Sequence, residues 1–337
     1  MTEPAVARGW QLVRRPVGVP RPEDFHLAEV DVPELPDGEV RVRNAFLSVD
    51  PYMRGRMNDA RSYAPPYALG EVMTGGAVGR VVASRDDRLP EGTTVLHDRG
   101  WRDVAQGPAR LFRPVVTPAG LRDSVHLGPL GMVGLTAWAG LVEVAGMRTG
   151  DVVFVSGAAG AVGSLAGQIA RLRGAGKVIG SAGSDHKVDV LVERYGFDAA
   201  FNYHAAPVRD QLRQVAPDGI DVYFDNVGGD HLEAAIDAFR EFGRAAVCGA
   251  VSSYNATEPP AAPRNLSAII GKGVTLRGFL VVQHQSSAAR AAAEIGGWLT
   301  DGRLVADETV VRGLPRAVEA FLDMLGGANT GKMLVAL

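Results

Sequence analysis

Cysteine is almost absent from this sequence. Its 337 residues include one, Cys248, so no intramolecular disulfide can form. A structural zinc lobe with four thiolates is excluded for the same reason, and so is a catalytic zinc held by two cysteines and a histidine. The seven histidines form no pair at helical or short-loop ligand spacing. We therefore expect no metal site in this chain.

Long apolar runs and a surplus of positive charge are also missing. No apolar stretch reaches the roughly 18 residues that a membrane-spanning helix requires. The first residues, Met-Thr-Glu-Pro, lack the charged start and the apolar core of a signal peptide. The formal net charge is -3, and no run of Lys or Arg alternates with aromatic residues, so nothing here attracts nucleic acid. We expect a cytoplasmic protein with no nucleic-acid or membrane partner.

The sequence does contain an apolar strand that runs through a glycine turn into a helix. Residues 152–155 read Val-Val-Phe-Val, residues 157–163 read Gly-Ala-Ala-Gly-Ala-Val-Gly, and residues 165–172 are apolar at helical spacing. Glycines let a backbone approach a pyrophosphate, whose charge then faces the amides and dipole of the new helix. A plain turn in a glycine-rich chain gives the same spacing, so the flanking strand and helix carry the interpretation. Together they predict a βαβ unit that binds a dinucleotide.

The end of the second strand indicates which dinucleotide is bound. NAD-type folds place an acidic residue there, about 20 residues past the glycines, to bond the adenosine ribose. The expected strand at 177–182 is instead followed by Gly183 and Ser184. Without that carboxylate nothing repels a 2′-phosphate, which the Ser184 hydroxyl and the Lys187 ammonium can bind. The pattern favours NADP(H), while an ordinary solvated role for Lys187 stays open, and we interpret Asp185 as a helix N-terminal residue.

The order of elements predicts two domains. Residues up to about 125 contain short strands, such as 39–49 and 76–84, between Pro and Gly turns, whereas strands and helices alternate from about 130 onward. The strand expected at 332–335 needs a partner for its backbone groups and finds one in the N-terminal unit. We predict an α/β protein with a β-rich domain formed by residues 1–128 and 304–337. Residues 129–303 form a Rossmann domain with a doubly wound parallel sheet.

Several motifs in sequence order resemble a known family. They are Val-Asp-Pro-Tyr-Met-Arg-Gly-Arg-Met at 49–57, the glycine turn with Gly-Gln at 167–168, Gly-Ser-Asp-His-Lys at 183–187, Phe-Asn-Tyr at 201–203, Asp-Asn-Val-Gly-Gly at 225–229, Cys-Gly-Ala-Val-Ser-Ser-Tyr-Asn at 248–255 and Asn-Thr-Gly-Lys at 329–332. Over nearly the whole chain the sequence resembles the zinc-independent medium-chain dehydrogenases/reductases. Within them it is similar to the prostaglandin reductase and alkenal double-bond reductase (leukotriene dehydrogenase-like) branch. Where zinc-dependent relatives carry Gly-His-Glu, this chain has Gly70 and Glu71.

The resemblance implies a fold and an activity. The β-rich domain becomes a GroES-like domain, and the reaction becomes NADPH-dependent reduction of the carbon-carbon double bond of an α,β-unsaturated aldehyde or ketone. Hydride reaches the β-carbon, an enolate forms and the α-carbon is protonated. Two alternatives stay open, an NADPH:quinone oxidoreductase on the same fold and an NADPH-binding protein without turnover.

The resemblance also implies roles for individual residues. The pyrophosphate site comprises Gly160, Ala161, Val162 and Gly163, and the 2′-phosphate site comprises Ser184, Lys187 and Tyr203. The remaining cofactor contacts are Asn226 at a strand end, a loop beside the nicotinamide (Cys248, Gly249, Ala250, Ser252 and Tyr254), a segment along its carboxamide (Phe279, Leu280 and Val281) and Asn329 from the tail.

Tyr52 is the candidate proton donor, because a phenol can donate while it stays neutral near pH 7. Some eukaryotic members have a catalytic tyrosine where this chain has Gly271. A bound water, a ribose hydroxyl of the cofactor and a purely structural Tyr52 therefore stay open. Arg54 and Arg56 could steer an anionic substrate, but we expect them to form surface salt bridges.

The expected strand at 275–282 is apolar and ends the sheet. An unpaired edge of this kind is normally covered. We expect a homodimer in which two cofactor domains share one continuous sheet.

Overall fold

The computed structural model describes residues 6–258 and 261–337, so the N-terminal residues that bear on a signal peptide lie outside it. The chain divides into two compact units. Unit 1 is the chain up to Leu127 with Glu308–Asn329 and Met333–Leu337, and unit 2 is Gly128–Asp307 with Thr330–Lys332. Within the described ranges, no helix is both long and apolar enough to cross a bilayer.

Unit 1 is rich in antiparallel strands. Its main sheet has the order β14-β15-β3-β4-β5-β7 with β6 paired to β3, while β1 and β2 pair with each other. The closing strand β15 runs antiparallel to β3, with Leu334 opposite Ser48. The elements are β1 (Val6–Leu12), β2 (Phe25–Asp31), β3 (Glu39–Ser48), α1 (Tyr52–Arg56), β4 (Ala77–Ser84), β5 (Thr94–His97), β6 (Val104–Pro108), β7 (Arg113–Pro114), β14 (Glu308–Arg312), α9 (Ala317–Leu325) and β15 (Lys332–Ala336).

Unit 2 contains a parallel sheet of order β10-β9-β8-β11-β12-β13. From β8 the chain adds β9 and β10 on one side and then β11, β12 and β13 on the other, which is the arrangement of a doubly wound fold. The elements are α2 (Met132–Ala139), β8 (Val152–Val155), α3 (Ala161–Leu172), β9 (Lys177–Ala182), α4 (Asp185–Asp189), β10 (Ala199–Asn202), α5 (Val208–Val215), β11 (Ile220–Asp225), α6 (Gly229–Ala238), β12 (Phe239–Val247), α7 (Ala268–Lys272), β13 (Thr275–Gly278) and α8 (Ala288–Thr300).

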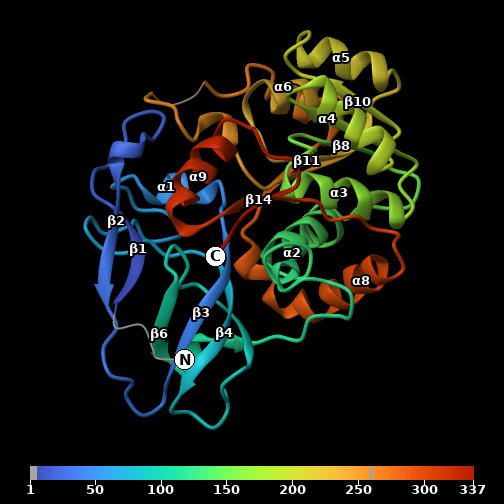
Figure 1. Cartoon of the computed structure of the whole chain (residues 1–337). Helices are drawn as coiled ribbons and strands as arrows, with labels where there is room; N and C mark the ends of the chain where they lie inside the picture. Colours follow the sequence, from blue (N-terminus) through green and yellow to red (C-terminus); the bar gives the residue numbers. More distant parts are fainter. Residues whose placement is uncertain (1–5, 259–260) are drawn as a thin grey trace. The chain divides into compact units, whose positions relative to one another are not determined.

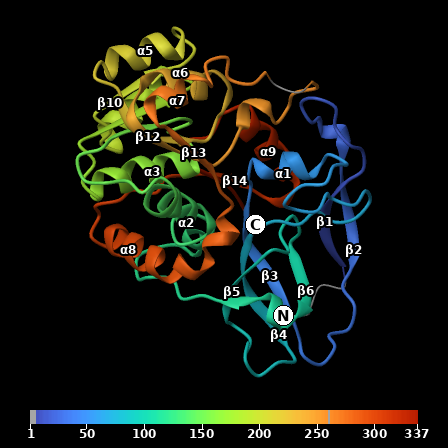
Figure 2. The same cartoon turned by 180° about the vertical axis from the view of Figure 1, so that it is seen from behind.

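Alternation along the strands of unit 2 places one layer of helices on each face of the sheet. Val153 and Val155 point into a core shared with α2, α3 and α8. Phe154 and Tyr223 point into a second core shared with α5 and α6. Figure 1 and Figure 2 show these two layers on opposite sides of the strands. The predicted fold class, an α/β protein with a Rossmann-like parallel sheet and a β-rich unit, is confirmed.

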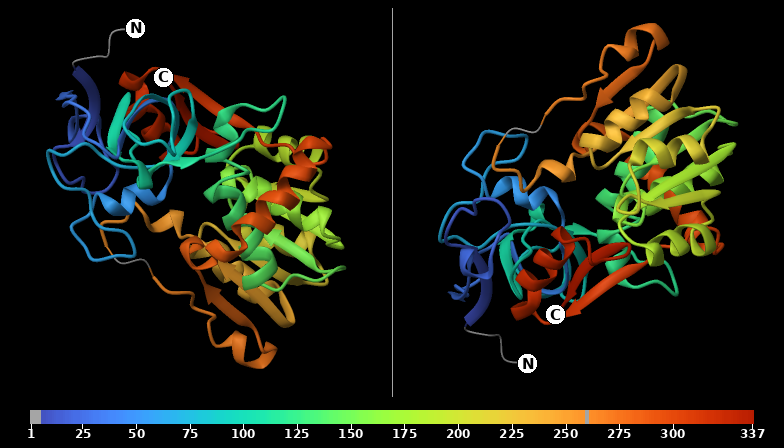
Figure 3. Two further views of the ribbon diagram at one scale, coloured as in Figure 1. Left: turned by 90° about the horizontal axis from the view of Figure 1, so that it is seen from below. Right: turned by 90° about the horizontal axis from the view of Figure 1, so that it is seen from above.

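The strand predicted at 275–282 is shorter than expected. β13 ends at Gly278, and Val281–Ser287 forms a 3-10 helix instead. The Phe279 ring packs edge-on against Phe224 and His284 at centroid distances of 6.4 and 5.8 Å, and these contacts turn the chain out of the sheet. β13 remains the edge strand, in orange at the margin of the sheet in Figure 3.

Candidate functional site

The glycine turn after β8 has the geometry of an anion site. Gly157 adopts a φ of 57°, and a Cβ on Gly163 would lie 2.4 Å from the Gly157 carbonyl oxygen. Gly160 is the N-cap of α3, and no side chain caps this helix. The amides of Ala161, Val162 and Gly163 therefore have no intrahelical acceptor and present the positive end of the helix dipole. This cradle fits a pyrophosphate.

Residues at the ends of β9 and β10 come together at the position expected for the 2′-phosphate. Ser184 caps α4 by accepting a hydrogen bond from the Lys187 backbone amide at 3.3 Å, which leaves its hydroxyl proton for a ligand. A Cβ on Gly183 would lie 2.9 Å from the Tyr203 hydroxyl. Burial lowers the pKa of the half-buried Lys187 ammonium from its ordinary value. Asp185 follows Ser184, and its carboxylate accepts a hydrogen bond from the Asn202 amide at 2.8 Å.

Two histidines hold the ring of Tyr203. His204 lies 4.3 Å from its centroid, and His231 lies edge-on at 5.2 Å. Burial lowers the pKa of His231 to about 4, so its imidazole is neutral. Sequence reasoning missed His231 because it lies on α6, and no local pattern links that helix to Tyr203.

Asn226 fastens the ends of β8 and β11 to each other. Its side-chain amide donates to the Ser156 carbonyl at 2.8 Å, and its backbone amide donates to the Ser156 hydroxyl at 3.0 Å. The buried Asp225 carboxylate accepts from the Tyr223 hydroxyl at 2.7 Å and from the amides of Val227 and Gly228 at 2.9 and 2.8 Å. Asp225 and Ser156 had no predicted role. Their position at strand ends, where parallel sheets bind ligands, is the signal that could have found them.

The predicted nicotinamide loop follows β12 and packs on the 226–228 turn. The amides of Cys248 and Gly249 both donate to the Asp225 carbonyl at 2.8 and 3.0 Å. The Ser252 hydroxyl donates to the Val227 carbonyl at 2.6 Å. Ala250 approaches Gly228, and the Tyr254 hydroxyl lies 3.5 Å from the Cβ that Gly249 lacks. Burial raises the pKa of the Cys248 thiol to about 12, so it is no nucleophile.

The segment from Phe279 to Val281 lies beyond the end of β13. Phe279 contacts Phe224, the residue before Asp225, so it lies near the same end of the sheet. Its other neighbour, His284, is held by the Glu143 carboxylate at 2.5 Å. The backbone amide and the side chain of Gln283 close the turn on Leu280.

The remaining predicted residues belong to unit 1. Tyr52 begins α1, and burial is the main cause that raises the pKa of its phenol above the ordinary value. Asn329 is buried. Arg54 and Arg56 were expected at the surface, but Arg54 is buried and Arg56 is half-buried. Arg54 is 2% exposed and donates to the Gly18 carbonyl at 2.8 Å, whereas Arg56 lies over the Tyr67 ring at 4.1 Å.

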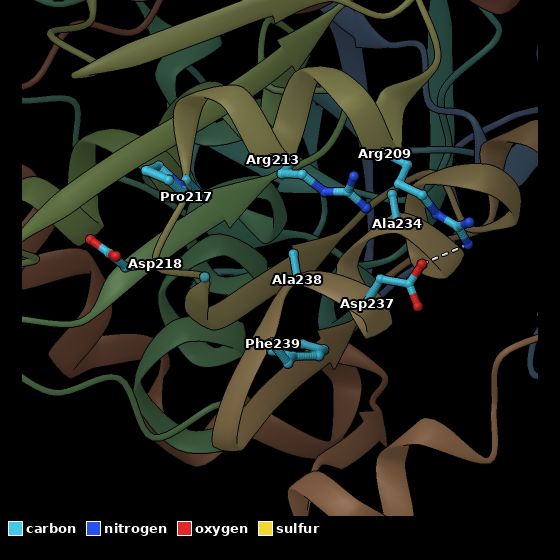
Figure 4. Close-up of a pocket in the computed structure, with 10 residues that line it drawn as sticks. Arg209, Arg213, Pro217, Asp218, Ala234, Asp237, Ala238 and Phe239 are labelled. Atoms are coloured by element: carbon cyan, nitrogen blue, oxygen red, sulfur yellow. Dashed lines mark ion pairs between the residues drawn. The ribbon is translucent and has the colours of Figure 1, made fainter.

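The described residues include no candidate metal cluster, and the hollow shown in Figure 4 is not part of the predicted cofactor site. Among the described residues, no group of three or more His, Cys, Asp and Glu side chains could hold a metal ion. The hollow, of about 330 Å³, lies between α5 and α6 and is lined by Arg209, Arg213 and Asp237 among others. None of its lining residues was predicted to bind the dinucleotide.

Two family models match the chain. One, described as the N-terminal domain of oxidoreductase, matches residues 8–115. The other, described as zinc-binding dehydrogenase, matches residues 161–295. The zinc of that description does not fit the residues present, because the described part of this chain has no cluster that could ligate it.

Whole-length relatives agree with both models. Prostaglandin reductase 1 of Bos taurus is 40% identical over 333 residues, covering 98% of each chain. The NADPH-dependent curcumin reductase of Escherichia coli (strain K12) is 38% identical over 337 residues, covering 97% of this chain and 96% of that protein. The crystal structure of CurA in complex with NADPH from Vibrio vulnificus superposes with a TM-score of 0.92 at 39% identity and covers 98% of both chains. The chain therefore belongs to the medium-chain dehydrogenase/reductase family, in the zinc-independent branch of the prostaglandin and curcumin reductases.

Proposed function

We propose that this protein reduces the carbon-carbon double bond of α,β-unsaturated aldehydes and ketones with NADPH. The observation that carries the proposal is the end-to-end similarity to two reductases, one named for prostaglandin and one for curcumin and NADPH. Curcumin contains double bonds conjugated to carbonyl groups, which is the chemical pattern that an enone reductase needs. The substrate class is therefore a 2-alkenal or 2-enone.

Unit 2 binds the cofactor. The uncapped first turn of α3 holds the pyrophosphate, and Ser184, Lys187 and Tyr203 surround the 2′-phosphate. The 226–228 turn, the loop from Cys248 to Tyr254 and the segment from Phe279 to Val281 flank the nicotinamide. When bound, NADPH supplies the hydride.

Tyr52 supplies the proton. Its pKa is raised by burial first and by the nearby Asp50 second, so the hydroxyl stays protonated throughout the neutral range. A neutral phenol can donate to the oxygen or the α-carbon of an enolate as charge develops there. The β-rich unit is then the catalytic domain, and unit 2 is the NADP(H)-binding domain.

The reaction can be tested with three acceptors. The purified protein is given NADPH with a medium-chain 2-alkenal, with the matching saturated aldehyde or with a benzoquinone, and NADPH absorbance is followed. We expect consumption with the alkenal, saturated aldehyde as the product by mass spectrometry, and no consumption with the saturated aldehyde. Turnover of the quinone alone would indicate a quinone oxidoreductase. Binding of NADPH without any turnover would indicate the non-catalytic alternative.

The edge of the sheet in unit 2 is the proposed dimer interface. β13 pairs only with β12 among the described strands, so its outer backbone groups can pair with a second copy. Two large apolar side chains lie close to this edge. Phe242 on β12 is 72% exposed and has a φ of 60°. Ile270 on α7 is 82% exposed. A two-fold contact that joins the two β13 strands covers the edge and these side chains together.

A further inference from the structure

Two short backbone segments, residues 305–307 and residues 330–332, are fixed inside unit 2. The first segment is held by a side chain of α3. The side chain of Gln168, which is 4% exposed on α3, donates to the Val305 carbonyl at 2.8 Å and accepts from the Val305 amide at 2.8 Å. Both backbone groups of Val305 are therefore held by one buried amide on the helix that follows the phosphate turn.

The same segment is also fixed at Asp307. Arg194 donates to its carboxylate through Nε and Nη2, both at 2.6 Å, and the Tyr195 hydroxyl donates at 2.8 Å. These hydrogen bonds, Arg194 first, hold the pKa of Asp307 below its ordinary value. A forked arrangement of this kind fixes orientation as well as distance.

The second segment is residues 330–332, which lies between Asp307 and the phosphate turn. The Gly331 amide donates to the Ala159 carbonyl at 2.8 Å, and Gly331 forms a parallel bridge with Gly160. On the other side, the Lys332 amide donates to the Asp307 carbonyl at 2.9 Å. Gly331 has a φ of +66°, and a Cβ there would lie 2.0 Å from that same carbonyl oxygen. Only glycine fits this gap.

We infer that Gln168 and Asp307 are positioning residues for the cofactor. They fix residues 305–307, those residues fix Gly331, and Gly331 holds the backbone of Ala159 and Gly160, where the helix that faces the pyrophosphate begins. The inference rests on the proposed function, and it gives roles to two motifs, Gly-Gln at 167–168 and Thr-Gly-Lys at 330–332, that the dinucleotide fingerprint leaves unexplained. Because linkage is reciprocal, NADPH must in turn protect the 330–332 segment.

Direct binding of NADPH to the full-length protein tests this inference. The variants are Asp307→Asn, which removes the charge that Arg194 binds, and Gln168→Met, which removes both hydrogen bonds at similar volume. The matched control is Glu294→Gln. Glu294 also pairs with an arginine, Arg173, at 2.5 Å and accepts from an aromatic donor, Trp138, at 2.7 Å in the same unit. Its partners lie outside residues 305–307 and 330–332.

We expect each positioning variant to raise the NADPH dissociation constant about tenfold, with kcat at saturating NADPH changed less than about twofold. In hydrogen exchange, the peptide containing Gly331 becomes protected when the wild-type protein binds NADPH, and it exchanges faster in Asp307→Asn. Glu294→Gln lowers the melting temperature but leaves the dissociation constant unchanged.

The inference is overturned if Asp307→Asn and Gln168→Met are folded and bind NADPH as tightly as the wild type. It is also overturned if Glu294→Gln weakens binding equally, because loss of stability then explains the effect. Failure of the wild-type protein to bind NADPH would instead refute the proposed function. The two failures are therefore distinguishable without any substrate.

Discussion

At the scale of single residues, the proposed 2′-phosphate site makes the choice of cofactor depend on Lys187. It is the cation among the three side chains placed around the 2′-phosphate, and Asn202 holds the competing carboxylate of Asp185. Charge-assisted hydrogen bonds to phosphate are among the strong ones. Under the proposed assignment, the distinction between NADPH and NADH rests mainly on this ammonium group.

Replacing Lys187 should remove that distinction. We expect Lys187→Ala to raise the dissociation constant for NADPH by roughly 10- to 100-fold while NADH binding stays the same. Fluorescence titration with both cofactors measures this. The control is Arg213→Ala, which removes an exposed cation beside the hollow of Figure 4. Equal losses for NADPH and NADH would contradict the assignment.

Comparison with a neighbouring tyrosine distinguishes a catalytic role of Tyr52 from a structural one. We expect Tyr52→Phe to lower turnover of an enone at least about tenfold with unchanged NADPH affinity, because the proton donor is lost and the packing is kept. The control is Tyr67→Phe, in which a hydroxyl that donates to the Thr74 carbonyl at 2.8 Å is lost. If turnover of Tyr52→Phe matches that of the wild type, Tyr52 is not the donor.

His97 makes the stability of unit 1 depend on pH. Its Nδ1 accepts from the Arg99 amide at 3.0 Å, and its Nε2 lies 2.9 Å from the Asn44 side-chain oxygen. A second proton would displace the Arg99 hydrogen bond. Burial lowers the pKa of His97 from 6.5 to about 3.

The sign of the effect follows from proton binding. Below about pH 6.5 the unfolded chain binds a proton that the folded protein does not bind. The free energy of unfolding therefore decreases as the pH is lowered, until the pKa of the folded state is reached. Each unit of pH should cost up to about 1.4 kcal/mol from this group. Urea unfolding at two pH values measures the slope, which should be smaller in His97→Gln. The same slope in both proteins would refute this account.

At the scale of elements, the strand, turn and helix from β8 to α3 show how far local sequence reaches. The strands at 152–155 and 177–182 were predicted with the bounds that the structure shows, because apolar residues bounded by glycine specify them locally. The segment at 279–282 could not be predicted in this way. Phe224 and His284, from other elements, decide the direction of Phe279.

The phosphate turn allows a sharp test of close backbone packing. We expect Gly163→Ala to abolish measurable NADPH binding, since its Cβ would collide with the Gly157 carbonyl at 2.4 Å and push α3 away from the turn. The control is Gly297→Ala on α8, where nothing lies within 4 Å of the new Cβ. That change should leave binding unaltered and stabilise the helix by up to about 1 kcal/mol. Titration and thermal melting distinguish the two, and tight NADPH binding by Gly163→Ala would refute the cradle.

At the scale of the whole molecule, the edge strand of unit 2 bears on assembly. A free edge strand with exposed apolar neighbours is a hazard in a monomer and an asset in a dimer. If two copies pair through β13, the interface must include Phe242 and Ile270.

A charge at Phe242 should therefore separate the copies. We expect a dimeric mass by light scattering for the wild type and a monomeric mass for Phe242→Glu at micromolar concentration, because a buried carboxylate without a partner is costly. Val17→Glu is the control, since Val17 is an apolar side chain of unit 1 with 85% exposure. A monomeric wild type, or an effect of both changes alike, would exclude this interface.

The sequence by itself determined the fold class, the glycine turn and the residues at 183–187. Each depends on a short contiguous pattern: apolar periodicity for the fold class, glycine spacing for the turn and charge for residues 183–187. Only the tertiary structure could place His231 against Tyr203, Ser156 against Asn226, and Gly331 against Ala159. Each of these contacts joins residues far apart in the chain. No local pattern encodes them, since packing between elements brings the partners together.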